Sequence, residues 1–307
     1  MNLSVELAPT HSSGLRLENP VMAASGTFGY GIEIAQLIDI QRIGAIICKG
    51  TTLEPRAGNS QPRLKETASG LLNSIGLENV GIGVLIGEKA PVWATWQVPV
   101  IVNIAAERIE DYAELAARLN GVPGVSGIEV NVSCPNVVTG GIEFGRTAHV
   151  AAEVTAAVTR ATSLPVIVKL TPNVTDVVEI AVAVAHAGAH AISLINTFPG
   201  MAIDLAKRKP FLGNISGGLS GPAIKPLALY IVYQVSKAVD IPVVGCGGIA
   251  STSDALEFIM AGAVATQIGT ANFINPHATL DILGGIHQFM EREGVQDISE
   301  LVGVAQR

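Results

Sequence analysis

The sequence is poor in aromatic and basic residues, and each shortage excludes a class of function. Its 307 residues include only 7 Phe, 4 Tyr and 2 Trp, which leaves few platforms for stacking nucleic-acid bases. The 19 Lys and Arg are outnumbered by 26 Asp and Glu, for a formal net charge of -7. A phosphate backbone calls for a basic face. We therefore expect no nucleic-acid partner.

Cysteines and long hydrophobic runs are also scarce. Cys48, Cys134 and Cys246 are odd in number and far apart, which argues against a disulfide framework and indicates a reducing compartment. Residues 1–20 lack the charged start and apolar run of a signal peptide. The one long apolar run, 177–195, contains a glutamate and two histidines, so it predicts a helix, a turn and a strand. We expect a cytoplasmic protein without membrane contact.

What the chain does contain is a repeated alternation of β-rich apolar segments and Ala-rich stretches with helical spacing, the pattern of βα units. Eight strands are predicted, at 20–24, 45–49, 100–104, 128–131, 166–170, 191–195, 242–245 and 265–268. Helices are predicted at 32–40, 109–119, 149–162, 176–187, 222–238, 254–261 and 278–293. Eight strands are what a closed (β/α)8 TIM barrel requires. No linker marks a boundary, so we predict a single domain over residues 1–307.

Two connections are too long for simple βα turns. Residues 50–97 follow the second predicted strand, and residues 198–221 follow the sixth. We expect both to be inserted loops at the C-terminal face of the strands, where they would wall or cover a site.

The hexapeptide 131–136, Asn-Val-Ser-Cys-Pro-Asn, places a thiol just past a predicted strand. Pro135 blocks a regular continuation, so Cys134 is expected in a loop that faces a ligand. A thiolate there could act as a general base, and Asn131 and Asn136 could hydrogen-bond a polar, planar ligand. The alternative is a buried structural cysteine, the commoner fate of a free thiol.

The C-terminal ends of the predicted strands are unusually polar. Barrel enzymes place their chemistry there, and the convergence of two lysines and three asparagines on one mouth indicates a ligand site. Any one of these residues alone could simply be solvated. The strand ends carry Ser25, Lys49, Asn103, Asn131, Lys169, Asn196 with Thr197, Gly247 with Gly248, and Gly269 with Thr270.

The last two loops, 243–250 and 267–271, are glycine-rich and precede predicted helices, so their amides could cradle a phosphate. Gly245, Gly247 and Ala250 also fit the dinucleotide pattern G-x-G-x-x-A, but the acidic ribose contact at the end of the next strand is missing. The pattern therefore favours a mononucleotide phosphate, with plain turn geometry as the alternative.

Five stretches together resemble one family: residues 49–56, 72–79, the hexapeptide 131–136, Gly247-Gly248 and Gly269-Thr270. The chain resembles the soluble (class 1) dihydroorotate dehydrogenases. The resemblance implies a TIM barrel that binds FMN and oxidises (S)-dihydroorotate to orotate in pyrimidine biosynthesis.

The same resemblance implies residue roles. Cys134 would be the base that takes the C5 proton while hydride passes from C6 to the flavin. FMN would be held by Ser25, Lys49, Gly50, Asn103, Asn131, Lys169, Ile195, Gly221, Gly247, Gly248, Gly269 and Thr270. Orotate would be held by Lys49, Asn73, Ser74, Ile75, Gly76, Leu77, Asn131, Asn136, Asn196 and Thr197. The lysines, Lys49 and Lys169, could neutralise charge on a reduced flavin and a substrate carboxylate.

The loops 72–77 and 136–145 look like those of the NAD-linked subtype (type B), in which electrons leave through a second subunit carrying FAD and a [2Fe–2S] cluster. The resemblance then implies a homodimer of this chain joined to that subunit as a heterotetramer. Three scattered cysteines cannot supply the usual four cluster ligands, and we expect no metal here. Open alternatives are a fumarate-linked homodimeric enzyme, a dihydropyrimidine dehydrogenase-like subunit and a non-redox phosphate-binding barrel.

Overall fold

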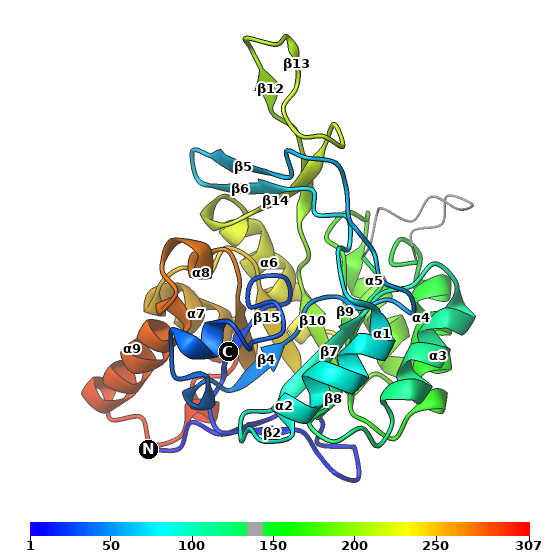
Figure 1. Ribbon diagram of the computed structural model, residues 1–307. Coiled ribbons are helices and arrows are strands. Elements are labelled where there is room, and N and C mark those ends of the chain that lie inside the picture. The colour runs from blue at the N-terminus through cyan, green and yellow to red at the C-terminus, as the bar shows by residue number, and fades with distance from the viewer. Residues whose placement is uncertain (134–143) are drawn as a thin grey trace.

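A closed barrel of eight parallel strands forms the body of the protein. The computed structural model describes residues 1–133 and 144–307. The hydrogen-bonded order runs β3-β4-β7-β8-β9-β10-β15-β16 and returns to β3 (Figure 1). The predicted (β/α)8 barrel is confirmed. Its strands are β3 (Val21–Ala23), β4 (Ala45–Ile47), β7 (Val100–Ile104), β8 (Gly127–Asn131), β9 (Val166–Lys169), β10 (Ala191–Leu194), β15 (Val243–Cys246) and β16 (Ala265–Ile268).

The strands form because both of their faces are buried. Each is rich in Val, Ile or Ala and is covered outside by helices and filled inside by side chains, as parallel sheets require. β8 departs from this composition, because the residue at its centre is the charged Glu129, which has no exposed surface. Its partners are described with the site.

In the described residues, six long helices surround the barrel (Figure 1). Five were predicted with ends within two residues, and the sixth, predicted as one helix at 222–238, is a 3-10 turn followed by α6. Ser251 caps α7 through a capping box with Asp254, which fixes where that helix begins. The helices are α3 (Ile109–Leu119), α4 (Ala148–Ala161), α5 (Val177–His186), α6 (Lys225–Ser236), α7 (Thr252–Met260) and α9 (Ala278–Glu293).

The helix predicted at 32–40 is wrong. That segment holds only two 3-10 turns, η1 (Ile34–Gln36) and η2 (Ile40–Arg42). Asp39 separates them, because its ψ of 89° is not helical and its side chain accepts a hydrogen bond from the Gln41 amide at 3.2 Å. The aspartate thus starts a new turn instead of continuing the old one.

The interpretation of 50–97 as inserted loop missed a helical stretch. α1 (Gly81–Val84), a π-helical turn η3 (Leu85–Lys89) and α2 (Ala90–Trp93) run together beside the barrel. Packing outweighs the weak helix propensity of its glycines. Trp93 is 1% exposed, and its indole Nε1 donates to the Tyr30 carbonyl at 2.9 Å.

Four strands of the two insertions form a roof sheet above the C-terminal ends of the barrel strands (Figure 1). Its antiparallel order is β11-β14-β6-β5, so strands from both insertions pair directly. The expectation that the insertions wall the site is confirmed. The strands are β5 (Leu64–Thr67), β6 (Gly70–Asn73), β11 (Phe198–Gly200) and β14 (Gly217–Ser220).

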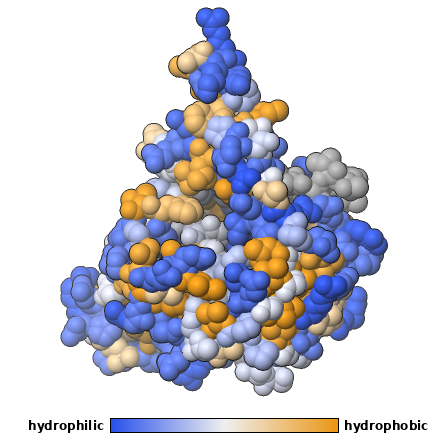
Figure 2. Space-filling view, viewed as in Figure 1, coloured by the Kyte–Doolittle hydropathy of each residue, from blue (hydrophilic) through white to orange (hydrophobic). Residues whose placement is uncertain are grey.

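Beyond the roof sheet, a hairpin of β12 (Ile203–Asp204) and β13 (Lys209–Pro210) projects from the body and carries a mostly hydrophilic tip (Figure 2). At the opposite end, β1 (Val5–Glu6) and β2 (Arg16–Leu17) lie against the amino ends of the strands, and His11 contacts His190 edge to face at 4.8 Å. Three short elements complete the described chain: α8 (Ala271–Ile274) and the turns η5 (Ile298–Glu300) and η6 (Val304–Gln306).

The run 177–195 is α5 followed by a turn and β10, as predicted. Across residues 1–133 and 144–307, no helix has the length and apolar character needed to cross a membrane.

Candidate active site

A cavity of about 1220 Å³ opens between the C-terminal ends of the barrel strands and the roof sheet. It brings together every predicted site residue within the described chain: Ser25, Lys49, Gly50, Asn73, Ser74, Ile75, Gly76, Leu77, Asn103, Asn131, Lys169, Ile195, Asn196, Thr197, Gly221, Gly247, Gly248, Gly269 and Thr270. Cys134 and Asn136 lie outside the described residues. Their predicted roles stay predictions.

One side of the cavity is formed by the glycine turn after β15. Gly247 has a φ of 124° and Gly248 a φ of 78°, values that favour glycine. A Cβ at Gly248 would also lie 2.6 Å from the Lys225 amide nitrogen. Only glycine therefore allows this turn to run so close to the start of α6.

The same turn is braced by Asp254. Its Oδ2 accepts from the amides of Ala250 at 3.0 Å and Ser251 at 2.9 Å. Its Oδ1 accepts from Lys225 Nζ at 2.5 Å, and that ammonium also donates to Glu257 Oε1 at 2.9 Å. Although burial opposes charge there, the hydrogen bond from Lys225 helps to hold the pKa of Asp254 below its usual range. The carboxylate therefore remains a fixed acceptor at neutral pH.

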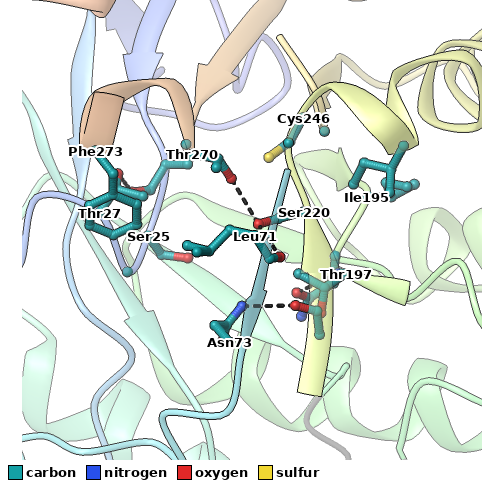
Figure 3. Close-up of a pocket in the computed structure, with 18 of the residues that line it drawn as sticks. Ser25, Thr27, Leu71, Asn73, Ile195, Thr197, Ser220, Cys246, Thr270 and Phe273 are labelled. Atoms are coloured by element: carbon teal, nitrogen blue, oxygen red, sulfur yellow. Dashed lines mark hydrogen bonds between the residues drawn. The ribbon is translucent and has the colours of Figure 1, made fainter. Parts of the chain in front are cut away.

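The donors that face the cavity from the two glycine turns suit a phosphate. Within the described residues, the amides of Gly248, Ile249, Gly269 and Thr270 donate to no protein acceptor. The Thr270 hydroxyl donates to Ser220 Oγ at 2.8 Å, which ties this corner to β14 (Figure 3). Unpaired amides beside the start of a helix are a ready anion site. The residues present fit a phosphate group.

The floor of the cavity carries Lys169, whose side chain is 6% exposed. Its Nζ lies 3.5 Å from Ser25 Oγ, 3.4 Å from Gln267 Oε1 and 4.0 Å from Glu129 Oε2. Burial by itself would lower the pKa of Lys169, but the neighbouring Glu129 and Cys246 together outweigh burial and raise that pKa. The cavity thus has a permanent cation at its floor.

Asparagines line the remaining wall. Asn131 Oδ1 accepts from the Ser133 amide at 3.1 Å and from Asn196 Nδ2 at 3.4 Å. Asn196 Oδ1 in turn accepts from the Thr197 amide at 2.9 Å. Asn73 Nδ2 donates to the Gly218 carbonyl on β14 at 3.3 Å, and Thr197 lies near this bond (Figure 3). These carboxamides offer both donors and acceptors to a planar polar ligand.

The segment 73–77 is held in an unusual backbone shape. Gly76 has a φ of 75° and Leu77 a φ of 56°. A Cβ at Gly76 would lie 2.5 Å from the Asn59 side chain, whose Nδ2 donates to the Ser74 carbonyl at 3.2 Å. Strained backbone of this kind gathers at functional sites.

Several cavity residues were missed by the sequence interpretation. Asn173 Nδ2 donates to the Thr197 carbonyl at 2.9 Å, and Ser220 and Cys246 also face the cavity. Glu129, which does not line the cavity but contacts two residues that do, was missed as well. A charged residue inside an apolar strand was the available signal for Glu129, whereas Asn173 and Ser220 lie in loops or an insertion without any distinctive pattern.

The two described cysteines are free and unsuited to base chemistry. Burial raises the pKa of the Cys48 thiol to about 12, and burial likewise raises that of Cys246. Both are therefore thiols at neutral pH. Among the residues that the structure describes, no group of His, Cys, Asp and Glu side chains could hold a metal ion.

The barrel, its unpaired loop amides and its polar strand ends define a (β/α)8 barrel protein whose mouth suits a phosphate-bearing ligand. The family model for dihydroorotate dehydrogenase matches residues 7–290, and the chain belongs to this family. Membership implies a flavin cofactor.

Curated relatives cover nearly the whole chain. Three of them carry the name dihydroorotate dehydrogenase B (NAD(+)), catalytic subunit. The relative from Geotalea daltonii is 56% identical over 302 residues, covering 98% of this chain and 97% of the relative. The relative from Pelobacter propionicus is 58% identical over 291 residues, covering 95% and 96%. That from Desulforamulus reducens is 55% identical over 305 residues, covering 99% of each chain.

Proposed function

We propose that this chain is the FMN-binding catalytic subunit of an NAD-linked dihydroorotate dehydrogenase. It oxidises (S)-dihydroorotate to orotate in the biosynthesis of pyrimidines and UMP, as one domain over residues 1–307. The observation that carries the proposal is the meeting of all the described predicted site residues around one cavity, in a chain of this family.

FMN is the flavin that the donor set fits. The phosphate goes to Gly247, Gly248, Gly269 and Thr270, because their amides and hydroxyl are gathered at one corner. When bound, FMN supplies the two-electron acceptor for a hydride from substrate C6. The rest of the cofactor is held by Ser25, Lys49, Gly50, Asn103, Asn131, Lys169, Ile195 and Gly221.

The chain's own residues bind the substrate and move its proton. Lys49 attracts the substrate carboxylate, while the carboxamides of Asn73, Asn131 and Asn196 hydrogen-bond the planar ring. Cys134 takes the C5 proton, so that loss of a proton from C5 and a hydride from C6 leaves the C5=C6 double bond of orotate. Asn136, Thr197 and the segment 74–77 complete the substrate contacts.

A partner subunit completes the enzyme. The relatives' names contain both "NAD(+)" and "catalytic subunit", which supports a second subunit that passes electrons to NAD⁺. We assign FAD and a [2Fe–2S] cluster to that subunit and propose a heterotetramer built on a homodimer of this chain. Three scattered cysteines support a cytoplasmic location.

The test is anaerobic mixing of the purified, FMN-loaded chain with dihydroorotate while the flavin absorbance is recorded. We expect bleaching, with no recovery when NAD⁺ or fumarate is added, because the partner is missing. Recovery on fumarate would reassign the chain to the fumarate-linked subtype. A folded preparation that takes up no flavin even from added FMN would defeat the proposal.

Cys134→Ala tests the assigned base. General-base catalysis contributes about 10²- to 10⁴-fold, so flavin bleaching should slow by that factor while FMN stays bound. Cys48→Ala is the matched control, since it removes a buried thiol away from the cavity. Near-native bleaching by Cys134→Ala would refute the role of the thiol.

A further inference from the structure

Glu129 is a fully buried carboxylate that joins four strands across the barrel interior. It accepts hydrogen bonds from Asn103 Nδ2 at 2.6 Å, Gln267 Nε2 at 2.7 Å and Ser193 Oγ at 2.9 Å. These donors stand on β7, β16 and β10, and all are neutral. A buried charge needs both hydrogen bonds and a counter-charge, and the neutral donors supply only the first.

The counter-charge is Lys169, 4.0 Å away on β9. Among the described residues, the titratable groups that act on Lys169 are Glu129 and the Cys246 thiol, and the buried Cys48 thiol also senses Glu129. The other partners of the ammonium, Ser25 and Gln267, are neutral and lie at 3.5 and 3.4 Å. Glu129 is therefore the carboxylate that sets the charge state of this lysine.

Glu129 also fixes the orientation of Asn103. The Glu129 carboxylate accepts a hydrogen bond from Asn103 Nδ2, which turns Asn103 Oδ1 toward Gly50. A Cβ at Gly50 would lie 3.0 Å from this oxygen. Asn103 and Lys169 both line the cavity, whereas Glu129 does not. The carboxylate thus acts on the cavity through two neighbours, one presenting an acceptor and the other a positive charge.

We propose that Glu129 is a positioning residue that keeps Lys169 charged and Asn103 turned toward a flavin that Glu129 itself does not touch. The inference rests on the proposed function, in which the cavity holds FMN. A fixed cation beside a flavin favours the reduced form, because reduction adds negative charge to the ring. Glu129 thereby tunes how readily the flavin accepts electrons.

Glu129→Gln tests this role, because it keeps the shape of the side chain and removes its charge. Without its counter-ion, Lys169 is expected to lose its proton at a lower pH. In the FMN-loaded chain, the reduction equilibrium is measured against a reference dye between pH 7 and 10. The reduced-to-oxidised ratio should fall about tenfold relative to the native chain as that proton leaves.

Two controls separate charge from packing. Ser193→Ala removes a neutral donor to the same carboxylate and should keep the native pH profile. The double variant Glu129→Gln with Lys169→Met should lack the step that separates Glu129→Gln from the native chain, since no lysine remains to lose a proton. A folded, FMN-bound Glu129→Gln chain whose pH profile matches the native one would overturn the proposal.

A second measurement does not depend on the flavin. Urea unfolding measures the coupling of Glu129 to Lys169. It compares the purified native chain, Glu129→Gln, Lys169→Met and the double variant that combines them. If the two single effects simply added, they would predict a certain unfolding equilibrium constant for the double variant. We expect the measured constant to be about tenfold smaller than that prediction, so that the double variant is more stable than additivity implies. Additive effects would refute the pairing. Failure of the native chain to bind flavin or bleach with dihydroorotate would refute the proposed function and leave this cycle unaffected.

Discussion

Two lysines near the cavity meet carboxylates in opposite surroundings. The side chains of Lys169 and Glu129 are 6% and 0% exposed and lie 4.0 Å apart. Lys225, at 22%, contacts Asp254 and Glu257 at 2.5 and 2.9 Å, with Glu257 at 47%. The interior pair is longer but shielded from water, whereas the rim contacts are short and partly open to solvent, with Asp254 at 16%. Distance alone therefore misjudges which contact matters more.

The two arrangements also do different work. The interior pair places a charge under the cavity, and its other hydrogen bonds hold that charge and orient Asn103. The rim cluster instead secures backbone, because Asp254 accepts amides from the glycine turn while it binds Lys225. Breaking the first should change electrostatics and stability together, and breaking the second should change mainly local geometry.

Breaking the interior pair with Lys169→Met should have the largest effect. It leaves Glu129 buried without a cation, and removing one partner of a buried pair costs about 3–5 kcal/mol in the free energy of unfolding. FMN affinity should fall as well. Urea denaturation and flavin titration measure the two effects, and a stability loss below about 1 kcal/mol would contradict the difference drawn between the pairs.

The same variant carries a pH prediction. Because the folded pKa of Lys169 is raised above its usual 10.5, the stability it contributes is fully present below that value. It is lost only as pH rises through the higher folded pKa. The stability gap between native and variant chains should therefore stay constant from pH 7 to 10. A gap that closes in that range would contradict the assigned direction.

Gly248→Ala changes the backbone of the glycine turn that Asp254 holds. Its φ of 78° and the 2.6 Å approach to the Lys225 amide make a Cβ strained and crowded, at a cost of about 1–3 kcal/mol. FMN affinity should drop, because the turn must move. Gly83→Ala is the matched control, since a Cβ there meets nothing within 4 Å in α1. Equal behaviour of the two variants in flavin titration would rule out the steric explanation.

Lys225→Met breaks the rim contacts while sparing the backbone. These ion pairs are partly open to solvent, and such pairs contribute about 0–1 kcal/mol, so the stability loss should be small and should shrink in 1 M salt. Thermal unfolding at low and high salt checks this. A loss as large as that of Lys169→Met, and insensitive to salt, would show that the rim cluster acts as a buried pair.

Thr266→Val tests a buried polar group that lacks a partner, in contrast to the partnered Glu129 and Lys169. We expect the smallest effect from this variant. Within the described chain, Thr266 Oγ1 is the buried side-chain polar atom that has no hydrogen-bond partner. Valine keeps the shape and removes the unsatisfied hydroxyl, so stability should rise by about 1 kcal/mol. Destabilisation in the same urea assay would indicate that the hydroxyl has a partner after all.

The sequence was sufficient for the barrel because its strands are separate apolar runs that end in polar residues. The strand 100–104 and the helices 109–119 and 278–293 have the predicted bounds. The helical stretch 81–93 was hidden by three glycines and a proline, whose propensity is overridden by the burial of Trp93. Local sequence pattern cannot reveal such tertiary packing.

The residues of the candidate site likewise divide into those that the sequence could predict and those that it could not. Strand-end residues such as Lys169 and Asn131 were found because the fold itself gathers them. Glu129 was missed because its importance depends on donors from three other strands, and the pairing of β6 with β14 was missed because it joins two distant insertions. Non-local contacts of this kind leave no periodic signal in either segment.

That pairing limits how the protein can vary. Asn73 stands opposite Gly218, and Leu71 opposite Ser220, whose hydroxyl meets Thr270. A single-residue insertion in either strand would turn alternate side chains to the other face of the roof sheet. Such a change would need an answering change some 145 residues away. The two insertions thus share one register, and an insertion or deletion that shifts it in one strand requires a matching shift in the other.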